Sequence, residues 1–176
     1  MVVISGTPVL RGGVSRYDGA ERLGRLRDIG VTEEGAVRIE ESMGIAAPPE
    51  RVWAVMADVE RWHEWTASIR SVQLLEPGPL AIGSRARVVQ PRIPPVVWQV
   101  TELEPGRSFT WVARLPGQRS EGRHTVVPDG AGGSVAPLSI QMSGPIGWLV
   151  GKLLGGMSRR FVRMEAEGLK RRAEGE

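Results

Sequence analysis

The chain has 176 residues, 41% hydrophobic and 24% charged, with a formal net charge of +3. These values are typical of a single soluble globular domain and exclude wholesale disorder. With no cysteine and two histidines, the chain also excludes disulfides, thiolate metal sites and a histidine-rich zinc cage. We therefore expect no metal and no cofactor, and so small a charge gives no reason to expect a nucleic-acid partner.

Residues 1–35 are rich in glycine and charged side chains and differ in composition from the rest of the chain. Leucines at near-helical spacing predict one short helix over 20–29. We expect the segment to be a loosely structured N-terminal extension that carries no chemistry. It has no basic stretch followed by a long apolar run, so no secretory signal is expected and we predict a cytoplasmic protein.

The main domain is expected to span 36–176 and to begin with a strand over 36–45, where hydrophobic and polar residues alternate. A proline pair at 48–49, followed by Glu50, ends this strand and begins a helix. Proline suits the first helical turn, and an early acidic side chain complements the helix dipole. A second short helix or turn is expected over 60–65.

Six short apolar runs follow, separated by breaks rich in proline and glycine, and this pattern predicts an antiparallel meander. The predicted strands are 69–76, 84–90, 96–103, 108–115, 121–127 and 134–142. The break at 91–95 is expected to be a loop that forms one lip of a ligand portal. Pro137, inside the last run, indicates an edge, a bulge or an early strand end.

After Gly144-Pro145 the hydrophobic period returns to 3.6 residues and predicts one long helix. Its charged residues, Glu165 included, are expected on a solvated face. The spacing of Gly147, Gly151 and Gly155 predicts a close approach to a loop or a ligand portal. No run of 18 or more apolar residues occurs, so no integral membrane span is expected. The expected inward face comprises Ile146, Val150, Leu153, Leu154, Met157, Phe161, Met164 and Gly168.

Dispersed motifs carry a family resemblance over residues 36–173. They are IAAPPERVW at 45–53, DVERWHEW at 58–65, VTELEPG at 100–106, GAGGSV at 130–135, and GP at 144–145 leading to MEAEGLK at 164–170. Together they resemble the polyketide cyclase/dehydrase-like branch of the START/SRPBCC superfamily. The resemblance implies an α+β helix-grip fold: a curved seven-stranded antiparallel sheet around a long C-terminal helix, with two short helices after the first strand, enclosing a hydrophobic cavity.

Strand alternation predicts which side chains face that cavity. Broad indole rings suit a pocket for rings or polyenes, and ordinary core packing is the alternative. The expected ligand-binding residues are Trp65, Val88, Trp98, Val100, Phe109, Trp111, His124, Ile140, Met157 and Phe161.

Two residues are candidates for catalysis. His124 lies mid-strand on the expected inner face, where an imidazole can orient a carbonyl or transfer a proton, and a satisfied core histidine is the alternative. Glu41 interrupts the apolar face of the first strand. It is either a buried acid/base partner for His124 or a carboxylate that meets solvent or an arginine. His63 is expected at the surface.

We predict that a monomer or homodimer binds a small hydrophobic ligand, aromatic, polyketide or isoprenoid-like, in an internal cavity. A fold does not fix function, and two alternatives stay open. One is a polyketide cyclase-type enzyme that uses His124 as acid/base. The other is a protein-interaction module that grips a hydrophobic segment of a partner, which an exposed apolar patch near Trp62, Trp65 and Trp148 would favour.

Overall fold

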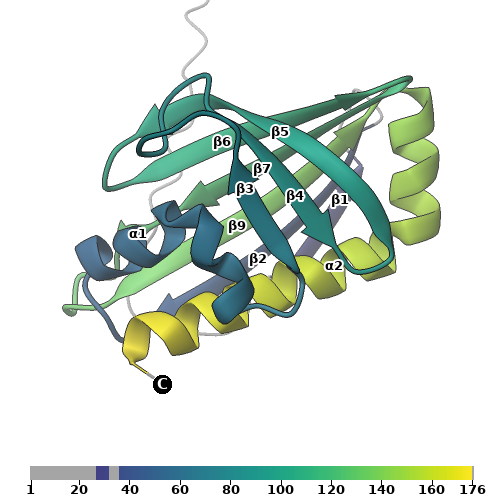
Figure 1. Cartoon of the computed structure of the whole chain (residues 1–176). Coiled ribbons are helices and arrows are strands. Elements are labelled where there is room, and N and C mark those ends of the chain that lie inside the picture. The colour runs from purple at the N-terminus through teal and green to yellow at the C-terminus, as the bar shows by residue number, and fades with distance from the viewer. Residues whose placement is uncertain (1–26, 32–35, 176) are drawn as a thin grey trace, which may run out of the picture.

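A computed structural model describes residues 27–31 and 36–175 of the chain. One antiparallel sheet curves around the long helix α2 (Pro145–Glu174), with α1 (Pro49–Ala57) and the short 3-10 helix η1 (Val59–Glu64) at one end (Figure 1). The strands are β1 (Arg27–Val31), β2 (Val37–Ile45), β3 (Ser71–Leu74), β4 (Arg85–Gln90), β5 (Ile93–Glu104), β6 (Ser108–Leu115), β7 (Gln118–Thr125), β8 (Val127–Pro128) and β9 (Ser134–Ser143).

The strand order is β1-β2-β9-β7-β6-β5-β4-β3, and β8 also pairs with β9. Strands β3 to β7 form the expected meander, while β9 lies between β7 and the first long strand, β2. This arrangement confirms the helix-grip fold and its two short helices after β2. All seven expected strands are present in the described part of the chain, with β1 and β8 added to them.

The N-terminal helix prediction is wrong where the structure tests it. Residues 27–29 of the predicted helix 20–29 lie in β1, which pairs antiparallel with β2, and residues 20–26 lie outside the described residues. A short isolated helix is marginal in water. The free backbone groups along the edge of β2 offer this segment hydrogen bonds that local helix formation cannot match.

The predicted loop at 91–95 is also wrong. Strands β4 and β5 are joined by a two-residue turn at Pro91 and Arg92, and Arg92 has a φ of 65°. Strand β5 then begins at Ile93 and continues through Pro94 and Pro95. The register shifts between Val88 and Gln90 of β4, opposite the prolines, and such an irregularity accommodates residues that have no N–H to donate.

Pro137 does not end β9. The strand pairs with β7 from Leu138 onward and with β8 at Val135 and Ser134, so Pro137 lies opposite the break between β7 and β8. On its other side it is paired in register with Ser42 of β2. The missing N–H therefore costs the sheet little, because no regular ladder bond is required on the β7 side at this point.

The first half of helix α2 packs on the sheet through glycine rather than leucine. Gly147 and Gly151 are buried, and a Cβ added at Gly151 would lie 2.7 Å from Val37 Cβ of β2. The expected close approach is therefore found at Gly147 and Gly151 but not at Gly155, and the predicted partner is wrong, since strands and not a loop or a portal meet the helix. The predicted inward positions of Leu153 and Leu154 are wrong, since both are exposed, as is Ile146. Glycine lets the backbone come so near that the apolar side chains point away from the sheet.

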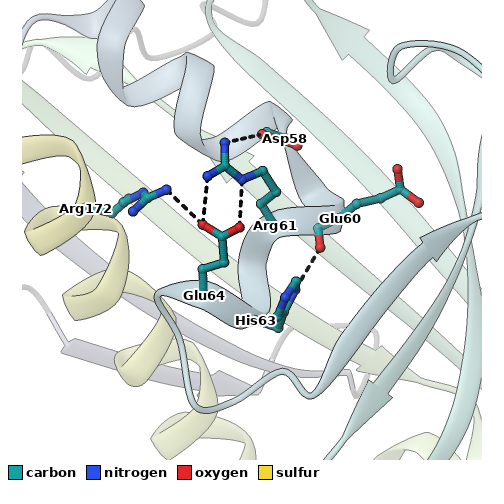
Figure 2. Close-up of polar contacts among 6 residues, drawn as sticks. All are labelled: Asp58, Glu60, Arg61, His63, Glu64 and Arg172. Atoms are coloured by element: carbon teal, nitrogen blue, oxygen red, sulfur yellow. Dashed lines mark hydrogen bonds and ion pairs between the residues drawn. The ribbon is translucent and has the colours of Figure 1, made fainter.

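A cluster of ion pairs holds η1 to the last turns of α2 (Figure 2). Glu64 accepts two hydrogen bonds from Arg61, at 2.8 and 2.9 Å, and one from Arg172 of α2 at 2.8 Å. The hydrogen bond from Arg61 holds the pKa of Glu64 below its usual range. His63 is exposed as expected, and its Nδ1 contacts the carbonyl oxygen of Glu60 at 2.9 Å.

The same end of α2 is also fastened to the connection between β2 and α1. Glu174 Oε1 accepts hydrogen bonds from the Ala46 backbone N–H at 2.6 Å and from Lys170, whose Nζ also donates to the Gly44 carbonyl. Burial raises the pKa of Glu174, but these hydrogen bonds outweigh burial and hold the pKa below its ordinary value.

We expect Glu174→Gln to lower the free energy of unfolding by about 1 kcal/mol at pH 7, because the charge that strengthens both hydrogen bonds is removed. A depressed folded-state pKa stabilises the protein above the ordinary Glu pKa, about 4.3, and this stability is lost as pH falls through the folded value. The difference from the wild type should therefore shrink below about pH 4 in urea denaturation. Glu104→Gln, in an ion pair with both side chains well exposed, is the control and should change stability little.

Candidate functional site

A cavity of about 90 Å³ lies between the inner face of the sheet and α2. Strands β4, β5, β6, β7 and β9 supply its floor, while η1 and α2 cover it. Its lining is mostly apolar and aromatic, with a few polar groups. The lining residues are Trp62, Ile69, Val88, Gln90, Ile93, Trp98, Trp111, Gly122, His124, Leu138, Ser139, Ile140, Ser158, Phe161, Val162 and Glu165.

Six of the ten expected ligand-binding residues line this cavity. They are Val88, Trp98, Trp111, His124, Ile140 and Phe161. Val100 and Phe109 are buried in the adjoining core, Trp65 packs against that core, and Met157 is half-buried on α2. The predicted inner face of the strands is confirmed by register, since Trp111 pairs with Gly122 and His124 with Leu138. That these side chains hold a ligand stays a prediction.

His124 is enclosed by aromatic rings. Phe109 stacks on the imidazole with centroids 4.5 Å apart and planes 10° apart, and Trp62 and Trp111 lie at 5.0 and 5.5 Å. Trp62 is itself fixed, because its Nε1 donates to the Met56 carbonyl at 3.0 Å. The rings hold the imidazole in one orientation and keep bulk water away from it.

Glu165 of α2 is the partner of His124. The His124 Nε2 to Glu165 Oε1 distance is 2.7 Å, and the two side chains are 7% and 13% exposed. A carboxylate oxygen accepts hydrogen bonds, so this contact places a proton on Nε2, and in the neutral imidazole Nδ1 is then an acceptor. Nδ1 is buried and has no partner among the described residues. An unpaired buried nitrogen is costly, so a ligand hydroxyl that donates to it would be favoured.

Sequence reasoning missed this partner and placed Glu165 on the solvated face of the helix. The signal was its spacing: Glu165 follows Phe161 by four residues, so the two share one face of α2. The surrounding arginines and glutamates resembled an ordinary surface pattern and hid it. A carboxylate at helical spacing from an expected pocket residue is the feature that would have identified Glu165 as a pocket residue.

Glu41 is 2% exposed and lies on the same sheet face. In the register it pairs with Leu138, which in turn pairs with His124, so Leu138 stands between the two. The structure therefore joins His124 to Glu165 and places Glu41 two strands away from His124, with β9 between them. Glu41 is a buried carboxylate beside Leu138, which lines the cavity, so it remains a candidate catalytic residue.

Gly122 determines how Trp111 lies over the cavity floor. A Cβ added at Gly122 would come within 2.5 Å of Trp111 Nε1 and 2.8 Å of its Cδ1. Only glycine lets the indole cover this point of β7, directly opposite it in the register. The neighbouring Trp98 ring lies 5.5 Å from Trp111, so two indoles form a continuous aromatic wall.

A second, more open cleft of about 400 Å³ lies at the other end of η1. Its lining includes Trp53, Asp58, Glu60, Leu80 and Leu103. Its carboxylates already have partners, because Glu60 Oε1 accepts a hydrogen bond from the Leu74 N–H and Asp58 lies near Arg61. The chemistry-bearing groups therefore gather in the inner cavity.

Among residues 27–31 and 36–175, no group of three or more His, Cys, Asp or Glu side chains is placed to hold a metal ion. In the same residues, no helix combines the length and the apolar character needed to cross a membrane.

The exposed patch considered for a protein-interaction module is not formed as expected. Trp62 is buried and Trp65 is only partly exposed, so of the three tryptophans Trp148 alone is exposed.

Comparison with known proteins agrees with this geometry. The family described as "Polyketide cyclase / dehydrase and lipid transport" matches residues 36–174. No curated protein sequence matches the chain.

Solved structures share the fold. The Zhui aromatase/cyclase from Streptomyces sp. R1128 is 19% identical, with a TM-score of 0.64 over 79% of this chain and 94% of that one. A START superfamily protein from Mycobacterium smegmatis is 16% identical, with a TM-score of 0.61 over 77% and 97%. A protein from Thermus thermophilus is 24% identical, with a TM-score of 0.60 over 78% and 96%.

Proposed function

We propose that this chain, which belongs to the family of polyketide cyclases/dehydrases and lipid transport proteins, binds a small hydrophobic ligand. The ligand would lie in the cavity between the sheet and α2. The observation that carries this proposal is the cavity's composition. Three indoles and several aliphatic side chains surround the polar pair His124 and Glu165, whose imidazole has an unpartnered nitrogen among the described residues. Apolar burial would supply the affinity, and that nitrogen would orient the ligand.

The ligand class follows from the walls. Flat indoles favour rings or conjugated chains, and an acceptor nitrogen favours a ligand with a hydroxyl group. Pockets for drug-sized ligands measure roughly 300–1,000 Å³, whereas this cavity measures about 90 Å³. Binding would therefore enlarge the cavity by moving half-buried wall residues such as Phe161 and Val162 of α2.

The test is to purify the protein, examine it by native mass spectrometry and extract any bound molecule under denaturing conditions. An apolar fluorescent probe is then titrated into the same preparation. We expect a co-purified apolar molecule or saturable probe binding. A protein that carries no molecule and binds no apolar probe would contradict the proposal.

Ser158→Phe should abolish this binding. Ser158 lines the cavity from α2, so a phenyl ring there would fill the space while leaving the sheet unchanged. We expect probe affinity to fall at least about tenfold, which corresponds to about 1.4 kcal/mol. Arg171→Phe, which introduces the same ring at an exposed position of the same helix, is the matched control and should bind as the wild type does. Equal binding by both variants would place the ligand elsewhere.

A cyclase or dehydrase activity is the second candidate, favoured by the His124–Glu165 pair. Glu165 would orient the imidazole, the free Nδ1 would take a proton from the substrate, and the indoles would hold the chain in a folded conformation. Glu41 would act as a further buried carboxylate. Turnover of a poly-β-ketone analogue should fall about 100-fold or more in His124→Gln with affinity retained. Unchanged turnover would remove His124 from the chemistry.

A further inference from the structure

The first half of α2 carries an apolar surface that the elements over 27–31 and 36–175 leave exposed. Its members are Ile146, Trp148, Leu149, Leu153 and Leu154, all at least 42% exposed, with Leu153 at 72%. Leu115, at the end of β6, is also exposed, and the hairpin that follows it touches this helix, because the Gly117 carbonyl accepts a hydrogen bond from the Ile146 N–H. We call these six residues the α2 patch.

Packing does not explain the patch. The contacts with the sheet are made by Gly147 and Gly151, and the large apolar side chains of the patch take no part in them. Figure 1 shows that α2 bends, so that its first turns stand at an angle to the remainder. Gly155 and Gly156 are adjacent in α2, and glycine is a common cause of helix bends. Large side chains on the far side of a glycine-packed helix add nothing to the core, and their exposure costs solubility.

The charge around the patch is of one sign. Between Pro145 and Met164 the charged residues are Lys152, Arg159, Arg160 and Arg163, and there is no aspartate or glutamate. Lys152 is exposed on the same turns as the leucines, with Nζ 5.0 Å from the Trp148 ring. Arg160 is also exposed. Leucine and tryptophan beside flexible cations are typical of helices that lie in the interface of an anionic bilayer.

We propose that the α2 patch docks this protein on the surface of an anionic phospholipid bilayer, with the leucines inserted among the acyl chains and Lys152 and Arg160 at the phosphates. A second copy of the chain fits the surface less well. A symmetric dimer through this patch would bring Lys152 and Arg160 close to the same cations of the partner, without acidic residues of the patch to offset them. A bilayer supplies both the apolar depth and the negative charge.

Docking would also bring the inner cavity near the membrane. Ser158 and Phe161, which line the cavity, follow the patch on the same helix. An apolar ligand could then pass between bilayer and cavity without crossing water. This consequence depends on the proposed ligand binding, whereas docking itself does not.

The experiment is flotation of the full chain with vesicles of phosphatidylglycerol and phosphatidylcholine, compared with vesicles of phosphatidylcholine alone. We expect the wild type to bind the anionic vesicles, to bind the neutral ones at least tenfold more weakly, and to dissociate as salt is raised. Leu149→Glu/Leu153→Glu should reduce anionic binding at least tenfold. Lys152→Glu/Arg160→Glu should abolish the preference for anionic lipid.

Ile82→Glu is the matched control, because Ile82 is 66% exposed but lies on the connection between β3 and β4. It should bind as the wild type does, and circular dichroism checks that every variant is folded. Equal vesicle binding by the leucine variant would overturn the proposal. The proposal would also be overturned if the wild type bound no vesicles and formed a dimer that the two leucine substitutions dissociate. The patch would then be a subunit interface. Ser158→Phe should bind vesicles as the wild type does. This variant therefore distinguishes a failure of the cavity proposal from a failure of the docking proposal.

Discussion

Gly168→Ala is expected to destabilise the protein by about 3 kcal/mol, or to prevent folding. Gly168 is buried where α2 passes η1, and an added Cβ would lie 2.2 Å from the Trp65 carbonyl oxygen and 3.0 Å from its ring. The obstacle is backbone. The Trp65 carbonyl shares its peptide unit with the Thr66 N–H, which donates a hydrogen bond to the Trp62 carbonyl, so the Trp65 carbonyl cannot rotate away as a side chain can. Overpacking of this kind costs roughly 1–3 kcal/mol and sometimes more.

Chemical denaturation of Gly168→Ala against the wild type measures this effect. Gly156→Ala is the matched control on the same helix, since its added Cβ meets nothing within 4 Å. Alanine has the higher helix propensity by about 1 kcal/mol, so this control should be neutral or stabilising. Equal behaviour of the two variants would mean that α2 does not pass so close to Trp65.

The second large effect is expected at the pair formed by His124 and Glu165. Glu165→Leu should cost about 2 kcal/mol, because it leaves a buried imidazole with neither nitrogen bonded. His124→Phe should cost a similar amount, because it leaves a mostly buried carboxylate without its partner. The double variant His124→Phe/Glu165→Leu replaces both polar groups with apolar ones and should cost less than the sum of the two by at least about 1 kcal/mol.

Urea denaturation of the four proteins completes the cycle. The exposed pair Arg107 and Glu104, with side chains 63% and 59% exposed, is the control, and its coupling should be within about 0.5 kcal/mol of zero. Additivity within about 0.5 kcal/mol at His124 and Glu165 would show that the contact does not stabilise the fold. If the double variant is folded, its probe binding then reports what the polar pair adds to ligand recognition.

Much of the sheet and of the cavity floor was predictable from local pattern. Alternation along each strand correctly placed Trp98, Trp111 and His124 on the inner face, because side chains of successive strand residues point to opposite faces. Proline and glycine breaks separated the strands, and the family resemblance implied the helix-grip arrangement of these elements. The predicted loop at 91–95 was wrong, because a shift in the register between β4 and β5 accommodates Pro94 and Pro95 within a strand.

The helix faces were harder to predict. Hydrophobicity alone placed Leu153 and Leu154 inward, whereas the structure turns Gly147 and Gly151 to the sheet. A helix with small residues on one side can approach a strand more closely than one with leucines there, and that closeness depends on Val37, which lies more than a hundred residues away in the chain.

The sequence by itself determined the strands β2 to β7 and β9, the two short helices, the long helix and the aromatic inner face, since these follow from spacing within one segment. Only the tertiary structure decided that Glu165 meets His124, that Glu41 lies two strands from His124, and that the leucines in the first half of α2 face outward. The physical reason is the same in each case. A side chain's surroundings depend on which distant element packs against it and how closely, and periodicity within one element carries no information about that.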